Sequence, residues 1–230
     1  MIIVSWNIEK CGLSSAQDKR AALDTLLFDA AYKQYADIIF LCEVHGARVD
    51  DFAEFLTNVY GQHYAIDAVD GNYSNNYVFL VNKNVLVNYG TVSVSNWQNE
   101  RPMLAIQCGL SSGTVYAGFI HAKSGQTGLT KHQIHNCARW LQDRSADRWF
   151  LSGDLNWDYN RQDELTLPEG AQGNSYWFDM SQRKGGLLDW ALCGKYTTAT
   201  TRSLSLLRTQ HDTVIDMSQM DHKPVLFGVR

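Results

Sequence analysis

The hydrophobic pattern of the chain consists of short apolar runs separated by polar or glycine-containing segments. Apolar runs of four to eight residues, bounded by polar residues, are typical of buried strands. The run at 91–94 alternates between apolar and polar positions, which favours a strand with one exposed face. We expect strands at 2–6, 37–42, 77–81, 91–94, 103–108, 114–120, 149–152, 187–192 and 225–229.

Three segments have the apolar spacing of an amphipathic helix instead. They are residues 16–35, residues 49–59 and a segment that starts at Thr130, where Thr130 and Gln133 fit a capping box. The polar stretch 158–186 predicts a loop with little regular structure. Many strands with a few interspersed helices predict an α/β fold, in which two mainly antiparallel sheets pack together with helices outside.

The length of 230 residues, without a repeat or a linker-like segment, predicts a single domain over residues 1–230. The longest apolar runs have five residues, such as 38–42, whereas a membrane span needs about 20. The first residues, Met1-Ile2-Ile3-Val4-Ser5, do not have the pattern of a secretory signal. We therefore expect no membrane span, and a protein that is cytoplasmic or exported by a non-classical route.

The formal charge of −4, from 20 basic and 24 acidic residues, argues against a nucleic-acid binder that is held by bulk positive charge. It leaves a nucleic-acid substrate open, because bound metal ions can offset carboxylates locally. The five cysteines are widely spaced and include no Cys-x-x-Cys pair, which argues against a zinc ribbon. We expect most of them to be buried thiols.

Polar side chains occur where several predicted strands end, and these positions are Asn7, Glu43, His121, Asp154 and Asp189. Residues at neighbouring strand ends can meet at one rim of a sheet, where a rigid scaffold holds binding and catalytic groups. Taken singly, each of them is more simply a residue that meets solvent. Their number and order favour one site.

Residues of these types can carry phosphoester hydrolysis. Mg²⁺ prefers carboxylates and water, so Glu43 is the first candidate ligand, with Asn7, Asp221 and Glu9 as further candidates. Such hydrolysis also needs an activated water, charge stabilisation on the phosphoryl oxygens and help for the leaving oxygen.

The remaining polar residues fit these catalytic tasks. Asp154 can orient or deprotonate water, and Asn156 can donate its amide to a phosphoryl oxygen. His222 can act as an acid or base with Asp189 holding its tautomer. His121 can donate to the phosphate or assist the leaving group.

Six motifs stand in a fixed order along the chain, and the most specific are Gly153-Asp154-Leu155-Asn156 and Asp221-His222-Lys223-Pro224-Val225. The pattern resembles the endonuclease/exonuclease/phosphatase superfamily, which has the DNase I-like fold. The resemblance spans nearly the whole chain. It implies a four-layer α/β sandwich and Mg²⁺ as cofactor, with Mn²⁺ as a substitute.

The resemblance extends to two further residues. Tyr73 resembles the active-site tyrosine of the family, and Arg101 resembles a phosphate-contacting arginine. DNase I-like members have a glutamate two residues after the tyrosine, which pairs with the first catalytic histidine. Asn75 occupies that place here, so a carboxylate partner for His121 is in question.

The substrate is less determined than the fold. The segment Gly186-Leu187-Leu188-Asp189-Trp190 lacks the signature of the phosphoinositide-phosphatase branch. Gly-Asp-x-Asn-x-Asp at 153–158 is closer to compact DNase I-like nucleases and to the nuclease subunit of cytolethal distending toxins. We expect a Mg²⁺-dependent phosphodiester hydrolase, with DNA as its substrate and an endonuclease activity. The alternatives are a phosphomonoesterase on phosphoinositide or nucleotide substrates, and a catalytically silent binding module.

Overall fold

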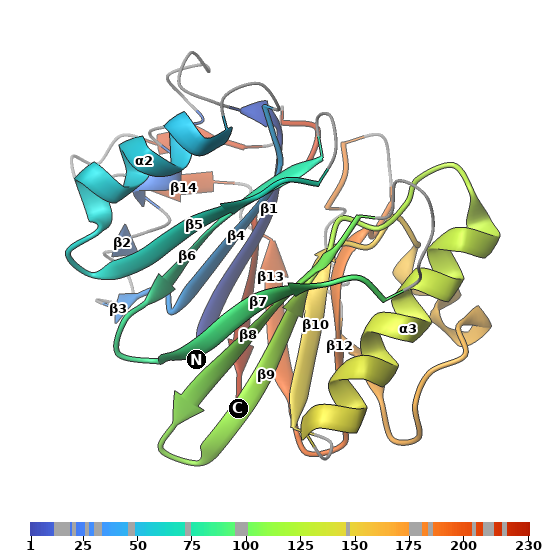
Figure 1. Ribbon diagram of the computed structural model, residues 1–230. Coiled ribbons are helices and arrows are strands. Elements are labelled where there is room, and N and C mark those ends of the chain that lie inside the picture. The colour runs from blue at the N-terminus through green and yellow to red at the C-terminus, as the bar shows by residue number, and fades with distance from the viewer. Residues whose placement is uncertain are drawn as a thin grey trace.

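The fold is that of a computed structural model. It describes residues 1–11, 19, 22–25, 28–29, 34–45, 49–71, 75–94, 101–145, 148–174, 181–183, 186–203, 206–208, 214–217 and 220–230. Within these residues two six-stranded sheets pack face to face. Helices α2 and α3 lie on opposite sides of the molecule (Figure 1). The predicted α/β fold of two packed sheets flanked by helices is confirmed.

The first sheet is built around a parallel pair. Strand β1 (Ile2–Cys11) runs parallel to β4 (Ile38–Val44), and the other pairs that the structure describes in this sheet are antiparallel. The remaining strands, in spatial order outward from β1 and then outward from β4, are β16 (Val225–Val229), β13 (Ala199–Ser203), β6 (Asn76–Asn82) and β5 (Tyr64–Val69).

The second sheet repeats this plan. Strand β10 (Trp149–Asp154) runs parallel to β9 (Gly113–Phe119), and the other described pairs are antiparallel. The remaining strands are β12 (Asp189–Cys193), β11 (Gln172–Asn174), β8 (Met103–Leu110) and β7 (Leu86–Val92). Each sheet therefore has a parallel pair at its centre, and the prediction of mainly antiparallel sheets is confirmed.

Side chains of the central strands alternate between two hydrophobic cores, because successive residues of a strand face opposite sides of its sheet. Ile3 and Phe40 join the core between the sheets, whereas Val4 and Leu41 join the core under helix α2 (Val49–Tyr60). On the second sheet, Trp149 and Leu151 pack under helix α3 (Thr127–Ser145), and Phe150 faces the inter-sheet core. Strands buried on both faces explain why these runs read as continuously apolar.

Several boundaries differ from the predictions. The helix expected over 16–35 is wrong in its second half, since β2 (Phe28–Asp29) and β3 (Gln34–Tyr35) pair as short antiparallel strands. Aromatic residues favour strands, and tertiary context overrides helix propensity. Residues 22–25 are helical as expected.

The start of α3 also differs, because the helix begins at Thr127 and Thr130 lies inside it. The Thr130 hydroxyl donates back to the Gln126 carbonyl at 3.0 Å, so the predicted capping box is wrong. The predicted loop 158–186 contains a 3₁₀ helix, η2 (Tyr159–Glu164), and strand β11. A further pair, β14 (Leu206–Arg208) with β15 (Val214–Asp216), was not predicted.

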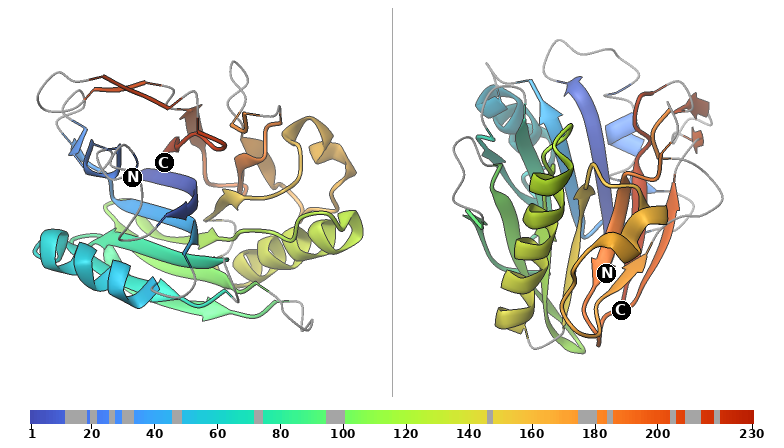
Figure 2. Two further views of the ribbon diagram at one scale, coloured as in Figure 1. Left: turned by 90° about the horizontal axis from the view of Figure 1, so that it is seen from above. Right: turned by 90° about the vertical axis from the view of Figure 1, so that its right-hand side faces the viewer.

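The two termini lie side by side at one end of the sandwich, as both views in Figure 2 show. The Met1 amino group donates to the Val229 carbonyl at 3.0 Å. Strand β1 starts at this end, passes through Asn7 and ends at Cys11, so Asn7 lies inside the strand rather than at its end as predicted. The predicted polar residues gather toward the opposite end of the sandwich.

Two composition-based expectations concern the core and the membrane. Cys42, Cys108, Cys137 and Cys193 are free and buried, as predicted for structural thiols. In the part of the chain that the structure describes, no helix combines the length and the apolar character that crossing a membrane requires.

Candidate active site

The two parallel strand pairs bring the predicted polar residues to one end of the sandwich. Asn7 of β1 pairs with Cys42 of β4, directly before Glu43. In the second sheet, Asp154 ends β10 and pairs with Asp189, the first residue of β12. Strand alternation places Asn7, Asp154 and Asp189 on the faces that line the inter-sheet core. These polar side chains therefore close the end of that core.

Glu43 is directed by an irregularity in its strand. The ladder between β4 and β6 shifts register between Cys42 and Val44, and Glu43 has a φ of 57°. A β-bulge re-aims the side chain of the bulged residue, and a non-glycine residue with positive φ persists only when its surroundings enforce it. The Glu43 carboxylate is partly exposed and lies 3.5 Å from Nε2 of His121.

Asp154 lies at the centre of the cluster. Its Oδ2 accepts a hydrogen bond from Nδ2 of Asn7 at 3.0 Å. The same oxygen lies 3.5 Å from Nε2 of His121 and 3.8 Å from Nε2 of His222. Its Oδ1 accepts from the backbone N–H of Asn156 at 3.0 Å. One buried carboxylate thus contacts residues from both sheets.

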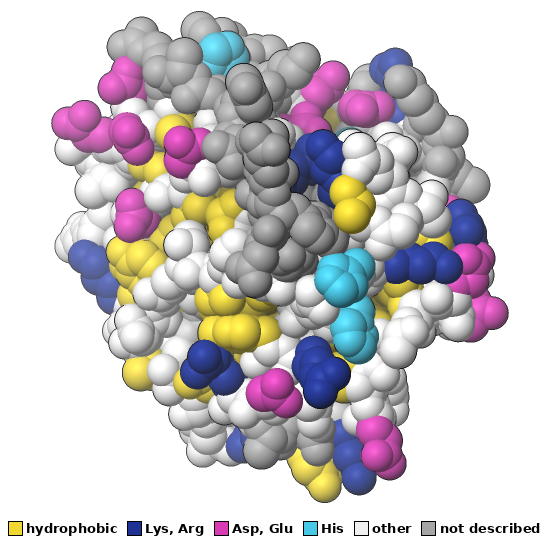
Figure 3. All heavy atoms as spheres, turned by 45° about the vertical axis from the view of Figure 1, so that its right-hand side comes forward, with side chains coloured by type: hydrophobic (Ala, Val, Ile, Leu, Met, Phe, Trp, Pro, Cys, Tyr) yellow, Lys and Arg dark blue, Asp and Glu magenta, His cyan; other side chains and the backbone are white. Residues whose placement is uncertain are grey.

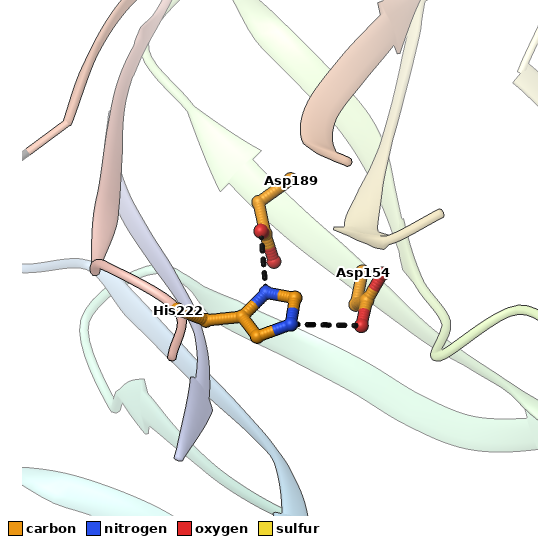
Figure 4. Close-up of side chains that lie close together, drawn as sticks. All are labelled: Asp154, Asp189 and His222. Carbon is orange, nitrogen blue, oxygen red and sulfur yellow. Dashed lines mark hydrogen bonds and ion pairs between the residues drawn. The ribbon is translucent and has the colours of Figure 1, made fainter. Parts of the chain in front are cut away.

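His222 and Asp189 form a buried dyad, shown with Asp154 in Figure 4. Nδ1 of His222 lies 2.7 Å from Oδ2 of Asp189. The expectation that these two side chains lie within hydrogen-bond reach is confirmed. Burial opposes the imidazolium, but the charge of Asp189, its hydrogen bond and the charges of Asp154 and Asp221 outweigh burial and raise the pKa of His222 to about 10.

The pKa of His121 shifts in the opposite direction to that of His222. Burial, together with the charges of Arg101 and His222, lowers the pKa of His121 to about 4, against the effect of Asp154. Nε2 of His121 faces Glu43 and Asp154, while its buried Nδ1 lacks a hydrogen-bond partner in the described structure. The sequence placed a carboxylate partner for His121 in question because of Asn75. The nearby carboxylates are instead those of Glu43 and Asp154.

The backbone around His121 is fixed by three side chains. Its N–H donates to the Tyr77 hydroxyl at 3.2 Å. Nη1 of the buried Arg101 donates to the carbonyls of His121 and Ala122, at 3.2 and 2.8 Å. Nδ2 of Asn156 donates to the same Ala122 carbonyl at 3.0 Å. The phosphate contacts expected of Arg101 and Asn156 stay predictions.

Three predicted residues lie apart from the central cluster. Glu9 is exposed, and its carboxylate lies 3.8 Å from Nζ of Lys19. Asp221 is partly buried and acts on the cluster through its charge, which helps to raise the pKa of His222. Tyr73 lies outside the described residues.

Trp157 packs against the charged side chains of two neighbouring segments. Its side chain is buried, with Lys131 Nζ 4.6 Å and Arg161 Cζ 4.5 Å from the ring centroid. The Glu164 carboxylate forms ion pairs with both of these basic side chains. The Trp157 indole N–H donates to the Arg161 carbonyl at 2.9 Å. These contacts hold the segment that follows Asn156 against helix α3.

Gly153 permits the close approach of β10, which ends at Asp154, to the segment that follows β9 and carries His121. It has a φ of 137°, and a Cβ at this position would lie 1.9 Å from the Ile120 carbonyl oxygen. Both the backbone conformation and the contact therefore require glycine.

Gly153→Ala should consequently separate these strands. We expect a loss of at least about 2 kcal/mol in the free energy of unfolding, because an enforced conformation of this kind costs about 1–3 kcal/mol before the clash is counted. Urea-induced unfolding followed by circular dichroism measures the change. Gly128→Ala is the matched control, since a Cβ there would meet nothing within 4 Å. Equal stability of the two variants would contradict this account of Gly153.

The cluster has the donors of a metal site. Asp154, Asp189 and His222 offer ligand atoms within 4.8 Å of one another, and all three are buried. Oδ1 of Asp189 is buried and has no hydrogen-bond partner among the described residues. Glu43 adds a further carboxylate, which shares His121 Nε2 with Asp154. Asn7 turns its amide nitrogen to Asp154, and its Oδ1 accepts from the Glu9 N–H at 3.1 Å. An oxygen-rich set of this kind fits a hard divalent cation.

Three residues that the sequence motifs did not indicate support the dyad and His121. Trp6 donates its indole N–H to the His222 carbonyl at 3.0 Å, Tyr77 supports His121, and Ser181 accepts from the Asp189 backbone N–H at 3.0 Å. Trp6 directly precedes Asn7, a predicted site residue, and this position is a usable signal. Tyr77 and Ser181 stand in segments without one.

The described part of the face in Figure 3 gives little electrostatic indication of a partner. Acidic and basic side chains both occur across the face in Figure 3, and its described atoms form no large basic patch. This distribution agrees with the formal charge of −4.

No protein-family model and no curated protein matches the sequence. Solved structures do match over the whole chain. TDP2 from C. elegans superposes with a TM-score of 0.68 at 16% identity, over 99% of this chain and 74% of that one. A mannosyl-6-phosphatase from Bacteroides thetaiotaomicron gives a TM-score of 0.68 at 13% identity, over 100% and 99% of the two chains.

The human Nocturnin catalytic domain, with a bound sulfate anion, gives a TM-score of 0.64 at 15% identity, over 100% of this chain and 93% of that one. Another match is described as an endonuclease/exonuclease/phosphatase family protein from Bacteroides thetaiotaomicron. The chain therefore has the DNase I-like fold that the sequence motifs predicted. At these identities the likeness establishes the fold and leaves the substrate open.

Proposed function

We propose that the protein is a metal-dependent hydrolase of phosphate esters. The observation that carries this proposal is the buried Asp189–His222 dyad, which faces Asp154 at the shared end of the two sheets. Hydrogen-bonded imidazole and carboxylate groups, placed beside a second carboxylate, form an arrangement for moving protons. The DNase I-like fold and the phosphatase among its structural neighbours support the same chemistry.

The residues divide the work by position. Asp189 fixes the orientation of the His222 ring, so that Nε2 faces Asp154 and the reacting groups. Asp154 orients the attacking water or accepts its proton. His121 donates a hydrogen bond to the phosphate or to the leaving oxygen. Glu43, Asn7 and Asp154 would hold the divalent cation, with Asp221 as a further candidate. When bound, that cation supplies charge neutralisation at the phosphoryl oxygens.

Within this class we propose a phosphodiester substrate, with DNA as the polymer and Mg²⁺ as the cation. The Gly-Asp-x-Asn-x-Asp sequence at 153–158 supports this choice. A structural neighbour, TDP2 from D. rerio, was solved in complex with a single-stranded DNA product. A phosphomonoester is the second candidate, because another neighbour is a mannosyl-6-phosphatase. The assembled dyad and carboxylates argue against a silent binding module.

Paired model substrates separate these candidates. The protein is incubated with bis(p-nitrophenyl) phosphate, a diester, and with p-nitrophenyl phosphate, a monoester, each with Mg²⁺ and with EDTA. Supercoiled plasmid and a single-stranded oligonucleotide are tested in parallel. We expect Mg²⁺-dependent cleavage of the diester and nicking of the plasmid. Release from the monoester alone would replace the nuclease by a phosphatase, and inactivity on every substrate would contradict the hydrolase.

A further inference from the structure

Ser181 occupies a buried position between the two halves of the dyad. It lies in the described segment 181–183, and its exposed fraction is 2%. The dyad itself spans both sheets, since Asp189 begins β12 of the second sheet and His222 precedes β16 of the first. Two groups on different sheets stay at hydrogen-bond distance only if something fixes their separation.

The Ser181 hydroxyl is fully used on the Asp189 side. It accepts from the backbone N–H groups of Leu188 and Asp189, at 3.1 and 3.0 Å. It donates to the Gly186 carbonyl at 3.5 Å. A hydroxyl has two acceptor positions and one donor, so the three contacts exhaust it. An alanine at this position would leave two N–H groups without their acceptor.

The backbone of the same segment holds the His222 side. The Ser181 carbonyl accepts from the Lys223 N–H at 2.9 Å, and the Arg183 N–H donates to the Asp221 carbonyl at 2.8 Å. Between them, Gln182 forms an isolated antiparallel bridge with His222. Residues 181–183 thus pair with 221–223, while the Ser181 side chain binds the start of β12.

We infer that Ser181 is a positioning residue, which sets the alignment of Asp189 with His222 by joining the strands that carry them. The inference rests on the proposed function for its catalytic consequence. The structural part does not depend on the substrate, because it concerns only the alignment of the dyad. Losing a supporting hydrogen bond behind a catalytic or metal-bound group typically lowers activity 10–100-fold.

The test compares Ser181→Ala with Ser181→Thr, which keeps the hydroxyl, and with Ser152→Ala. Ser152 is a buried serine whose hydroxyl donates to the Trp190 carbonyl at 3.1 Å, so the control loses a hydrogen bond to β12 without touching Asp189. We expect kcat for bis(p-nitrophenyl) phosphate to fall at least tenfold in Ser181→Ala, with KM unchanged. Ser181→Thr and Ser152→Ala should keep kcat within about twofold of the parent, which is less than the loss expected from a supporting group.

Nuclear magnetic resonance supplies a readout that does not require activity. In the parent, the Nδ1 proton of His222 should resonate far downfield, and the Asp189 amide should exchange slowly with solvent. Ser181→Ala should shift or broaden that proton signal and speed exchange of this amide, because the acceptor is gone. An unchanged signal and unchanged exchange would overturn the inference, as would equal loss of kcat in Ser152→Ala. A parent without hydrolase activity would contradict the proposed function alone.

Discussion

Chelation of divalent cations should abolish hydrolysis, and Glu43→Gln should raise the Mg²⁺ concentration needed for half-maximal rate by at least tenfold. Glu43 offers a partly exposed carboxylate beside the buried cluster, 3.5 Å from Nε2 of His121. Burial, with the charge of Asp154, raises the pKa of Glu43 against the opposing Asn7 hydrogen bond and the positive charges of His222 and Arg101. A bound cation would offset this burial of negative charge. The neutral amide of glutamine has no negative charge to attract the cation, so it would bind the cation more weakly.

The measurement is a titration of MgCl₂ and of MnCl₂ at saturating bis(p-nitrophenyl) phosphate, after dialysis against EDTA. Glu164→Gln serves as the matched control, because it removes an exposed carboxylate that pairs with Lys131 and Arg161 instead. Circular dichroism confirms that both variants are folded. Full activity in EDTA would refute metal dependence, and an unchanged titration for Glu43→Gln would remove Glu43 from the ligand set.

The central strands of this fold were predictable because both of their faces are buried. The run 38–42 is continuously apolar for that reason, and it forms β4. Strand β5 gives no comparable signal, since Tyr64–Val69 has intermediate and exposed positions between its buried ends. The segment 16–35 carries helical spacing, yet Phe28–Asp29 pairs with Gln34–Tyr35. Local pattern could not reveal that pairing.

The site was predictable to the extent that its residues follow strand ends. Asp154 and Asp189 are adjacent because β10 and β12 pair, and both lie in motifs that the sequence displays. Ser181 was not predictable, because its role depends on backbone groups of Asp189 and Lys223 that leave no trace in its own surroundings. The burial of Arg101 was hidden for the same reason, since its guanidinium donates to backbone carbonyls.

His222→Ala and Asp154→Ala should each lower kcat by about 10²–10⁴-fold, which is the usual contribution of general acid–base catalysis, while KM changes little. Both residues act on groups that change charge during the reaction, so their loss raises the barrier rather than weakening substrate binding. Asp189→Asn should follow His222→Ala in direction, because it keeps the shape of the dyad and removes the charge that orients the imidazole.

His132→Ala provides the control for this series, as it removes a histidine on helix α3 away from the dyad. Arg101→Ala is a poor control, because it would also free the carbonyls of His121 and Ala122. The assay is steady-state hydrolysis of bis(p-nitrophenyl) phosphate and of plasmid DNA by variants shown to be folded. Near-parental kcat in His222→Ala would remove the dyad from the chemical step. If Asp154→Ala were equally active, the reaction would have to occur elsewhere on the protein, since every close contact among Asn7, His121 and His222 passes through this carboxylate.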